Sequence, residues 1–203
     1  MKYLLFLFLF VATLGAPAQT AKKYLAGAVP TENGYVQFSK TYNVPGKSRT
    51  EIFNSLLEYT KTEIVGGAQH LNQSRITDNN VDEGIIVASM EEFLYFKRTA
   101  MVSHGTRFFY QLIFQIEDGA FTVEMRRIHY IYDGVDGTTS QAQNIRAEDW
   151  ITDNKALNKN GQKLNRTSGK FRKATIDRKD EIFRQAAIAS GAEVKTKVVV
   201  VDE

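Results

Sequence analysis

Three long segments in the middle of the chain alternate apolar and polar residues with the period of a β-strand. They span residues 85–98, 106–117 and 120–132, and they are separated by residues 103–105 and by Asp118-Gly119. An Asp-Gly pair between two alternating segments is a strong signal of a two-residue hairpin. The pattern therefore predicts three consecutive strands that form an antiparallel meander.

The middle strand of this meander has one polar and one apolar face. Gln111 and Gln115 lie on the polar face, because side chains two and four residues apart point to the same side of a strand. The residues in the opposite phase are Phe108, Tyr110, Leu112, Phe114 and Ile116. We therefore expect one face of the sheet to form the core and the other to be at least partly in contact with water.

The third strand changes phase near its centre. Its apolar residues are first Phe121, Val123 and Met125, and then Ile128, Tyr130 and Tyr132. A one-residue shift moves side chains to the other face unless an extra residue is inserted into the strand. The shift therefore predicts a β-bulge at Arg126 and Arg127.

Further elements are predicted before the meander. Residues 35–42 favour a first strand, and residues 70–78 favour a short strand with a weak pattern. Ser48 and Glu51 have the spacing of a capping box, which predicts the start of a helix. The apolar stripe of that helix is expected to contain Ile52, Phe53, Leu56, Leu57 and Thr60.

Two helices are predicted after the meander. Residues 148–158 favour a short helix, and a polar, basic stretch at 162–173 leads to a final helix. We expect Asp177 to be the N-cap of that helix and Gly191 to end it. Its predicted apolar stripe is Ile182, Phe183, Ala186 and Ala187. The order strand, helix, four strands, helix predicts an α+β fold, an antiparallel sheet with its helices on one face.

The N-terminus has the three parts of a secretory signal peptide. Met1-Lys2 is followed by an apolar run at residues 3–14 and by a small-residue cleavage site that ends at Ala18. The apolar run is shorter than the ~20 residues of a transmembrane helix, so we expect cleavage and export to the periplasm or the medium, with no stable membrane span afterwards. The alternative is an uncleaved N-terminal anchor.

The remaining chain is expected to form one domain with extensions. Residues 19–34 are interpreted as a lead-in segment, 35–134 as the α+β domain, 135–191 as a loop and a C-terminal helical extension, and 192–203 as a tail. There is no cysteine, which excludes disulfide bonds and a cysteine-linked lipid. The 26 Lys and Arg against 23 Asp and Glu give a net charge of +3, so composition predicts no nucleic-acid partner.

With this order of elements the chain resembles a known family, the exported Bacteroidetes proteins described as domain of unknown function 4468 with a TBP-like fold. The resemblance covers residues 35–134 by the order of elements. Three later stretches, 148–150, 169–172 and 180–183, are similar to the segment on the C-terminal side of the domain in relatives. The resemblance implies a TBP-like fold and carries no activity, because a fold does not determine a function.

Candidate chemistry is sparse. His70, His104 and His129 lack the spacing of a metal site, and no phosphate-binding glycine loop or nucleophile elbow is present. Glu91 and Glu92 are adjacent in a predicted strand, so they point to opposite faces and cannot act together as a carboxylate pair. We therefore predict no catalytic residues, no metal and no cofactor.

The predicted bulge offers the best candidate binding site, because bulges re-aim side chains and occur next to functional sites. Six polar side chains are expected to line a groove on the open sheet face: Gln111, Gln115, Glu124, Arg126, Arg127 and His129. The alternative for these residues is an ordinary solvated strand face.

Two functions remain open. The first is a non-catalytic binding module of the cell envelope, whose partner is an envelope protein or a glycan. The partner would be held either by the open sheet face around Arg126 and Arg127 or by the loop at residues 133–143. The second is a hydrolase that acts on surface or dietary glycan or peptide through acids such as Glu92 or Glu124. Two carboxylates that converge in a deep pocket would favour the hydrolase.

Overall fold

The computed structural model describes residues 21–99, 103–133 and 142–194 of the 203-residue chain. The predicted signal peptide at residues 1–18, most of the loop that comes after the meander, and the tail from residue 195 onward lie outside the described residues. Within the described residues, no helix is long and apolar enough to cross a membrane.

The core of the protein is an antiparallel six-stranded sheet. Its strands in spatial order are β3 (Phe38–Asn43), β7 (Ala120–Tyr132), β6 (Ser103–Glu117), β5 (Ile85–Arg98) and β4 (Arg75–Asn80), and β8 (Gln143–Arg146) also pairs with β7. The meander of β5, β6 and β7 is thus the centre of the sheet, as its alternation predicts. The Asp118-Gly119 hairpin is confirmed, because β6 and β7 pair up to Glu117 and Ala120.

Two short strands share the outer edge of β7. β3 pairs with β7 from Ala120 to Met125, and β8 pairs with it from His129 to Tyr132. Residues 126–128 lie between these two ladders. The predicted bulge is therefore located where the outer edge of β7 passes from one partner strand to the other.

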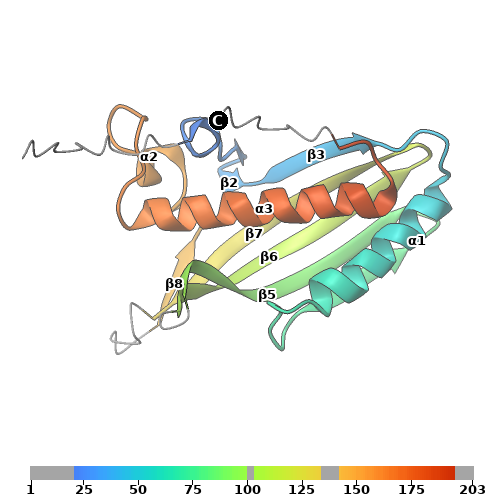
Figure 1. Ribbon diagram of the computed structural model, residues 1–203, viewed down its shortest axis with the longest axis horizontal. Helices are drawn as coiled ribbons and strands as arrows, with labels where there is room; N and C mark the ends of the chain where they lie inside the picture. The colour runs from blue at the N-terminus through green and yellow to red at the C-terminus, as the bar shows by residue number, and fades with distance from the viewer. Residues whose placement is uncertain (1–20, 100–102, 134–141, 195–203) are drawn as a thin grey trace, which may run out of the picture.

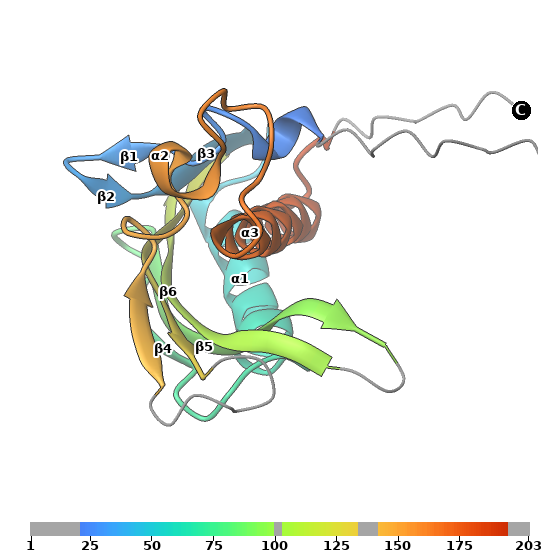
Figure 2. The ribbon, with the colours of Figure 1, turned by 90° about the vertical axis from the view of Figure 1, so that its left-hand side faces the viewer.

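Two helices pack on one face of the sheet, which confirms the α+β prediction (Figure 1). They are α1 (Arg49–Tyr59), which continues as the π-helical turn η2 (Thr60–Val65), and α3 (Ser168–Ser190). The sheet residues under them are the buried set Phe108, Tyr110, Leu112, Phe114 and Ile116. Neither α1 nor α3 lies over the face that carries Gln111 and Gln115 (Figure 2).

The start of α1 agrees with the sequence signal. The Glu51 backbone N–H donates to Ser48 Oγ at 3.4 Å, and the Ser48 backbone N–H donates to Glu51 Oε2 at 2.9 Å, so the capping box is present. The predicted stripe residues Ile52, Phe53, Leu56 and Thr60 are buried. Leu57 is half-buried and packs against the same core.

The predicted start of the last helix is wrong: α3 begins at Ser168, and Asp177 lies in its middle. The cause is Arg172, which makes this stretch look solvated although its side chain is fully buried. Its guanidinium donates to the carbonyls of Tyr24, Leu25 and Ile151 at 2.6–2.8 Å and to the Asp153 carboxylate at 2.8 Å. The carbonyl partners replace the water that an arginine normally needs. The predicted end at Gly191 and the buried stripe are confirmed.

Other boundaries also need correction. The predicted first strand is divided into β2 (Tyr35–Val36) and β3. The strand predicted at residues 70–78 begins later, as β4, and His70 lies outside it in an isolated bridge with Glu92. The predicted helix at 148–158 reduces to the four-residue α2 (Asp153–Ala156). Residues 103–105 belong to β6 and form no turn, and β8 was not predicted.

A two-stranded hairpin and a short helix precede the sheet. The helix is η1 (Lys22–Tyr24), and the hairpin consists of β1 (Thr31–Glu32) and β2. Asn33 and Gly34 connect the two strands with φ of 50° and 82°, the positive values that a tight Asn-Gly turn requires. Figure 2 shows the hairpin projecting away from α1 and α3, on the side of the open sheet face.

Candidate functional site

The predicted bulge in β7 is present. Gln111 of β6 pairs with Arg126 and Phe109 pairs with His129, so two β7 residues, Arg127 and Ile128, oppose a single β6 residue. Arg127 has a φ of 54°, a left-handed conformation that costs a non-glycine residue roughly 1–3 kcal/mol. The bulge turns the Arg127 side chain into solvent, where it is exposed.

Several of the predicted site residues are in contact with one another. Arg126 Nε donates to Gln111 Oε1 at 3.1 Å, and Arg126 Nη1 lies 3.9 Å from Glu124 Oε2. The imidazole of His129 stacks on the Phe109 ring with centroids 4.6 Å apart and planes 8° apart. Three of the six predicted residues, Gln111, Glu124 and Arg126, are therefore direct neighbours on the open face.

A groove of about 670 Å³ lies between these residues and the β1–β2 hairpin, and we name it the hairpin groove. Its sheet side consists of Gln115, Glu124, Arg126 and Arg127. Its hairpin side consists of Glu32, Asn33, Tyr35 and Gln37. Two carboxylates and two guanidinium groups thus line it, and their formal charges cancel.

A smaller groove of about 370 Å³ continues past the bulge toward β8. It shares Tyr35 and Arg127 with the hairpin groove and adds His129 and Arg146 to the lining. The Tyr35 ring, 61% exposed, stands at the boundary of the two grooves. Of the six predicted residues, Gln111 lines neither groove and instead positions Arg126.

The hairpin is held in place by the segment after β8. The Val36 backbone N–H donates to Glu148 Oε1 at 2.8 Å, and Arg146 Nε donates to Glu148 Oε2 at 3.3 Å. The Arg146 guanidinium also lies 5.7 Å from the centre of the Tyr35 ring. Sequence reasoning gave this hairpin no role in the site, although Asn33-Gly34 is a strong hairpin signal.

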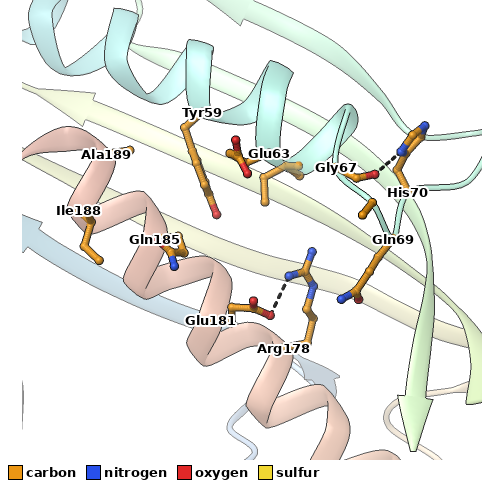
Figure 3. Close-up of a pocket in the computed structure, with 12 residues that line it drawn as sticks. Tyr59, Glu63, Gly67, Gln69, His70, Arg178, Glu181, Gln185, Ile188 and Ala189 are labelled. Carbon is orange, nitrogen blue, oxygen red and sulfur yellow. Dashed lines mark hydrogen bonds and ion pairs between the residues drawn. The ribbon is translucent and has the colours of Figure 1, made fainter. Parts of the chain in front are cut away.

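A second concave region lies on the covered side of the sheet, between the end of η2 and α3 (Figure 3). We name it the interhelical cleft; it has a volume of about 420 Å³. The side chains of Glu63 and His70 line one wall, and those of Arg178, Glu181 and Gln185 line the α3 wall. Sequence reasoning did not find this cleft, since its walls are far apart along the chain.

The cleft adjoins a buried charge network. Arg178 Nε and Nη2 donate to Glu92 Oε2 at 3.0 and 2.7 Å, and the Tyr110 hydroxyl also donates to Glu92. Burial and the nearby Glu92 charge raise the pKa of Tyr110 well above its ordinary value. Burial alone would lower the pKa of Arg178, but the Glu92 carboxylate outweighs that effect and the pKa is raised. The network therefore keeps Tyr110 neutral and Arg178 charged.

Glu91 and Glu92 point to opposite faces, as predicted. Glu91 accepts from Arg107 Nε at 2.8 Å, while Glu92 is held by Arg178 of α3. Both glutamates are buried and ion-paired. Neither carboxylate is therefore unpaired in the structure.

The three histidines lie in three different places. His129 is on the open face and His70 is at the interhelical cleft, where its Nδ1 contacts the Gly67 carbonyl oxygen. His104 packs against Phe96 with ring centroids 5.3 Å apart. Among residues 21–99, 103–133 and 142–194, no three His, Asp or Glu side chains are grouped as metal ligands.

Comparison with known proteins relates the chain to one family. The model of the family described as "Domain of unknown function (DUF4468) with TBP-like fold" matches residues 38–131. A crystal structure of a DUF4468 family protein from Bacteroides ovatus ATCC 8483 is 32% identical, with a TM-score of 0.74, over 86% of this chain and 96% of that one.

A second solved structure shares the fold. It is a TBP-like protein from Parabacteroides distasonis ATCC 8503, 23% identical with a TM-score of 0.62, over 81% of this chain and 99% of that one. No curated protein matches the chain.

Proposed function

This chain belongs to the DUF4468 family, and from that premise we propose that it is an exported, non-catalytic binding module of the cell envelope. Its partner is an envelope protein or a glycan, held in the hairpin groove. The signal sequence at residues 1–18 supports export. The family description names a fold and no activity, so the evidence for binding comes from the groove itself.

The observation that supports binding most strongly is the unused hydrogen-bonding capacity of the hairpin groove. Among the described residues, the side chains of Asn33, Gln37, Gln115 and Arg127 have no hydrogen-bond partner within the protein, and all of them line this groove. Amides donate and accept, and a guanidinium donates from a planar fork. Such a surface suits a partner rich in hydroxyl or amide groups.

The groove is also preorganised. The Glu148 contact with the Val36 backbone fixes the hairpin, and the Gln111 contact fixes Arg126. A surface that is already ordered loses less conformational entropy when a partner binds. The strained Arg127 supports the same view, because backbone strain collects at functional sites.

The alternative function, a hydrolase acting on glycan or peptide, has no observation in its favour. Glu92 is buried against Arg178, and Glu124 lies 3.9 Å from Arg126. The two carboxylates lie on opposite faces of the sheet, so they do not converge in one pocket as a pair of catalytic acids would. The groove is therefore better suited to holding a partner than to cleaving one.

The proposal is tested by affinity capture from envelope extract and culture medium, with the mature protein as bait. The test variant combines Tyr35→Ala, Arg126→Ala and Arg127→Gly, since glycine adopts the positive φ at the bulge without strain. The matched control removes two exposed arginines elsewhere, Arg75→Ala with Arg184→Ala.

The native protein and the control should retain the same protein or glycan, and the test variant should lose it while its circular dichroism spectrum is unchanged. Equal retention by a folded test variant would place the binding surface elsewhere. If the native protein retains nothing specific from either source, the binding-module proposal fails.

A further inference from the structure

The interhelical cleft has the size of a small-molecule site. Its volume of about 420 Å³ falls in the range of roughly 300–1,000 Å³ that ligand pockets occupy. One wall ends in η2, a π-helical turn, and such turns are frequent at functional sites. The cleft lies on the opposite side of the sheet from the hairpin groove, so this inference does not depend on the proposed function.

One part of the cleft is apolar. Tyr59 and Ile64 are buried residues of its wall, and Ile188 of α3 also lines it. Ile188 is 51% exposed, whereas the predicted stripe residues of the same helix are buried. A short apolar group in the cleft would cover Ile188.

Arg178 provides a fixed cation beside this apolar region. The Nε and Nη2 edge of its guanidinium is held by the buried Glu92, so the side chain is already oriented. Its remaining nitrogen, Nη1, donates at 2.8 Å to Glu181, whose side chain is 51% exposed (Figure 3). Because Glu181 is half-exposed and lies only three residues from Arg178 on the same helix, its pair contributes little free energy, so a ligand carboxylate can replace Glu181 on Nη1.

The cleft also contains carboxylates for a positive group. Glu63, on the η2 wall, has no hydrogen-bond or ion-pair partner among the described residues. Glu181 becomes a second acceptor once a ligand displaces it from Arg178. A simple anion that displaces Glu181 would face both carboxylates, and a simple amine would leave the Arg178–Glu181 pair in place and contact Glu63 alone. A ligand with both charges satisfies all three groups.

From this arrangement we infer that the interhelical cleft binds a free α-amino acid with an apolar side chain. The ligand carboxylate contacts Arg178, its ammonium group contacts Glu63 and Glu181, and its side chain packs on Tyr59, Ile64 and Ile188. The amides of Gln69 and Gln185, which also line the cleft, supply neutral hydrogen bonds to the same polar end.

The test is a nuclear magnetic resonance titration of the ¹⁵N-labelled mature protein with L-leucine. Two analogues separate the charged contacts: 3-methylbutylamine lacks the carboxylate, and 4-methylpentanoate lacks the ammonium group. L-Leucine should give saturable shifts in the amides of residues 63–70 and 178–189. Each analogue should bind at least about tenfold more weakly, the expected loss for one charged hydrogen bond.

Two substitutions make the assignment specific. Glu63→Gln should weaken L-leucine about tenfold, whereas the control Glu58→Gln, at an exposed position of α1 that does not line the cleft, should leave it unchanged. Glu181→Gln should strengthen 4-methylpentanoate, because the competitor for Arg178 is removed. Shifts with L-leucine outside the cleft, or no saturable shifts with L-leucine, L-valine or L-phenylalanine, would overturn the inference.

Discussion

The two faces of the sheet differ in how far water reaches a charged side chain, as two adjacent glutamates of β5 show. Glu91 on the open face pairs with Arg107, whose side chain is 41% exposed, while Glu92 on the covered face pairs with Arg178, which is 13% exposed. Water can reach the first pair around its arginine. The second pair is enclosed by α3 and the Tyr110 hydroxyl. A charge on the open face is therefore replaceable by solvent, and a charge on the covered face depends on one partner.

The same contrast holds for aromatic residues and gives the largest expected effect. Phe114→Ala removes a fully buried ring from the covered face and should lower the free energy of unfolding by ~3–5 kcal/mol. Phe109→Ala, on the open face, removes a half-buried ring that stacks on His129 and should cost about 1 kcal/mol.

Urea denaturation monitored by circular dichroism measures both variants. Equal losses for the two substitutions would show that the open face is covered in solution. That result would contradict the assignment of the hairpin groove as an accessible surface.

The strand assignments could be predicted from the sequence because the central strands are long. In the 13 to 15 residues of β5, β6 and β7, alternation is repeated often enough to fix both the strand and its buried face. The bulge at Arg126 and Arg127 was predictable for the same reason, since a phase shift is visible only against a regular pattern. The four residues of β8 are too few to show a regular alternation, so this strand could not be predicted.

The C-terminal helix shows where the sequence pattern misleads. Arg172 falls in the buried stripe of α3, but its charge makes the stretch look exposed until Tyr24, Leu25 and Ile151 supply their carbonyls. Those partners lie far away in the chain. The interhelical cleft was missed for the same reason, because Glu63 and Arg178 are brought together only when α3 packs beside η2.

The ion pairs of Glu91 and Glu92 should also contribute different amounts to the free energy of unfolding. Arg178→Ala leaves Glu92 buried with Tyr110 as its remaining partner and should cost about 3 kcal/mol, the lower end for breaking a buried pair, because some solvent reaches Arg178. Arg107→Ala removes a side chain that is itself 41% exposed, so water can then reach the otherwise buried Glu91 carboxylate, and the loss should be smaller, about 1 kcal/mol.

Urea midpoints at low and high salt distinguish these pairs. The loss for Arg107→Ala should shrink further in high salt, because exposed pairs are screened, and the loss for Arg178→Ala should not. A salt-sensitive Arg178→Ala variant would mean that water enters the Glu92 network freely.

The smallest effect concerns alkaline pH. Burial raises the pKa of Tyr130 on the covered face. The hydrogen bond between the Tyr130 and Thr175 hydroxyls, 2.8 Å apart, has the opposite and smaller effect on that pKa. Tyrosine in the unfolded chain ionises near pH 10 while the folded protein keeps Tyr130 protonated. Its contribution to stability is therefore complete below pH 10 and is lost as the pH rises above that value, by up to about 1.4 kcal/mol per pH unit.

Tyr130→Phe isolates this contribution from the titration of other groups. At pH 8 the variant should be less stable than the native protein by about 1 kcal/mol, because Thr175 loses its hydrogen-bond partner. The difference should shrink between pH 10 and 11, since the native protein alone loses the Tyr130 contribution there. Unfolding free energies from urea titrations at pH 8, 10 and 11 measure it. A difference that stays constant would show that water reaches the Tyr130 hydroxyl and that this end of the covered face is less closed than its packing indicates.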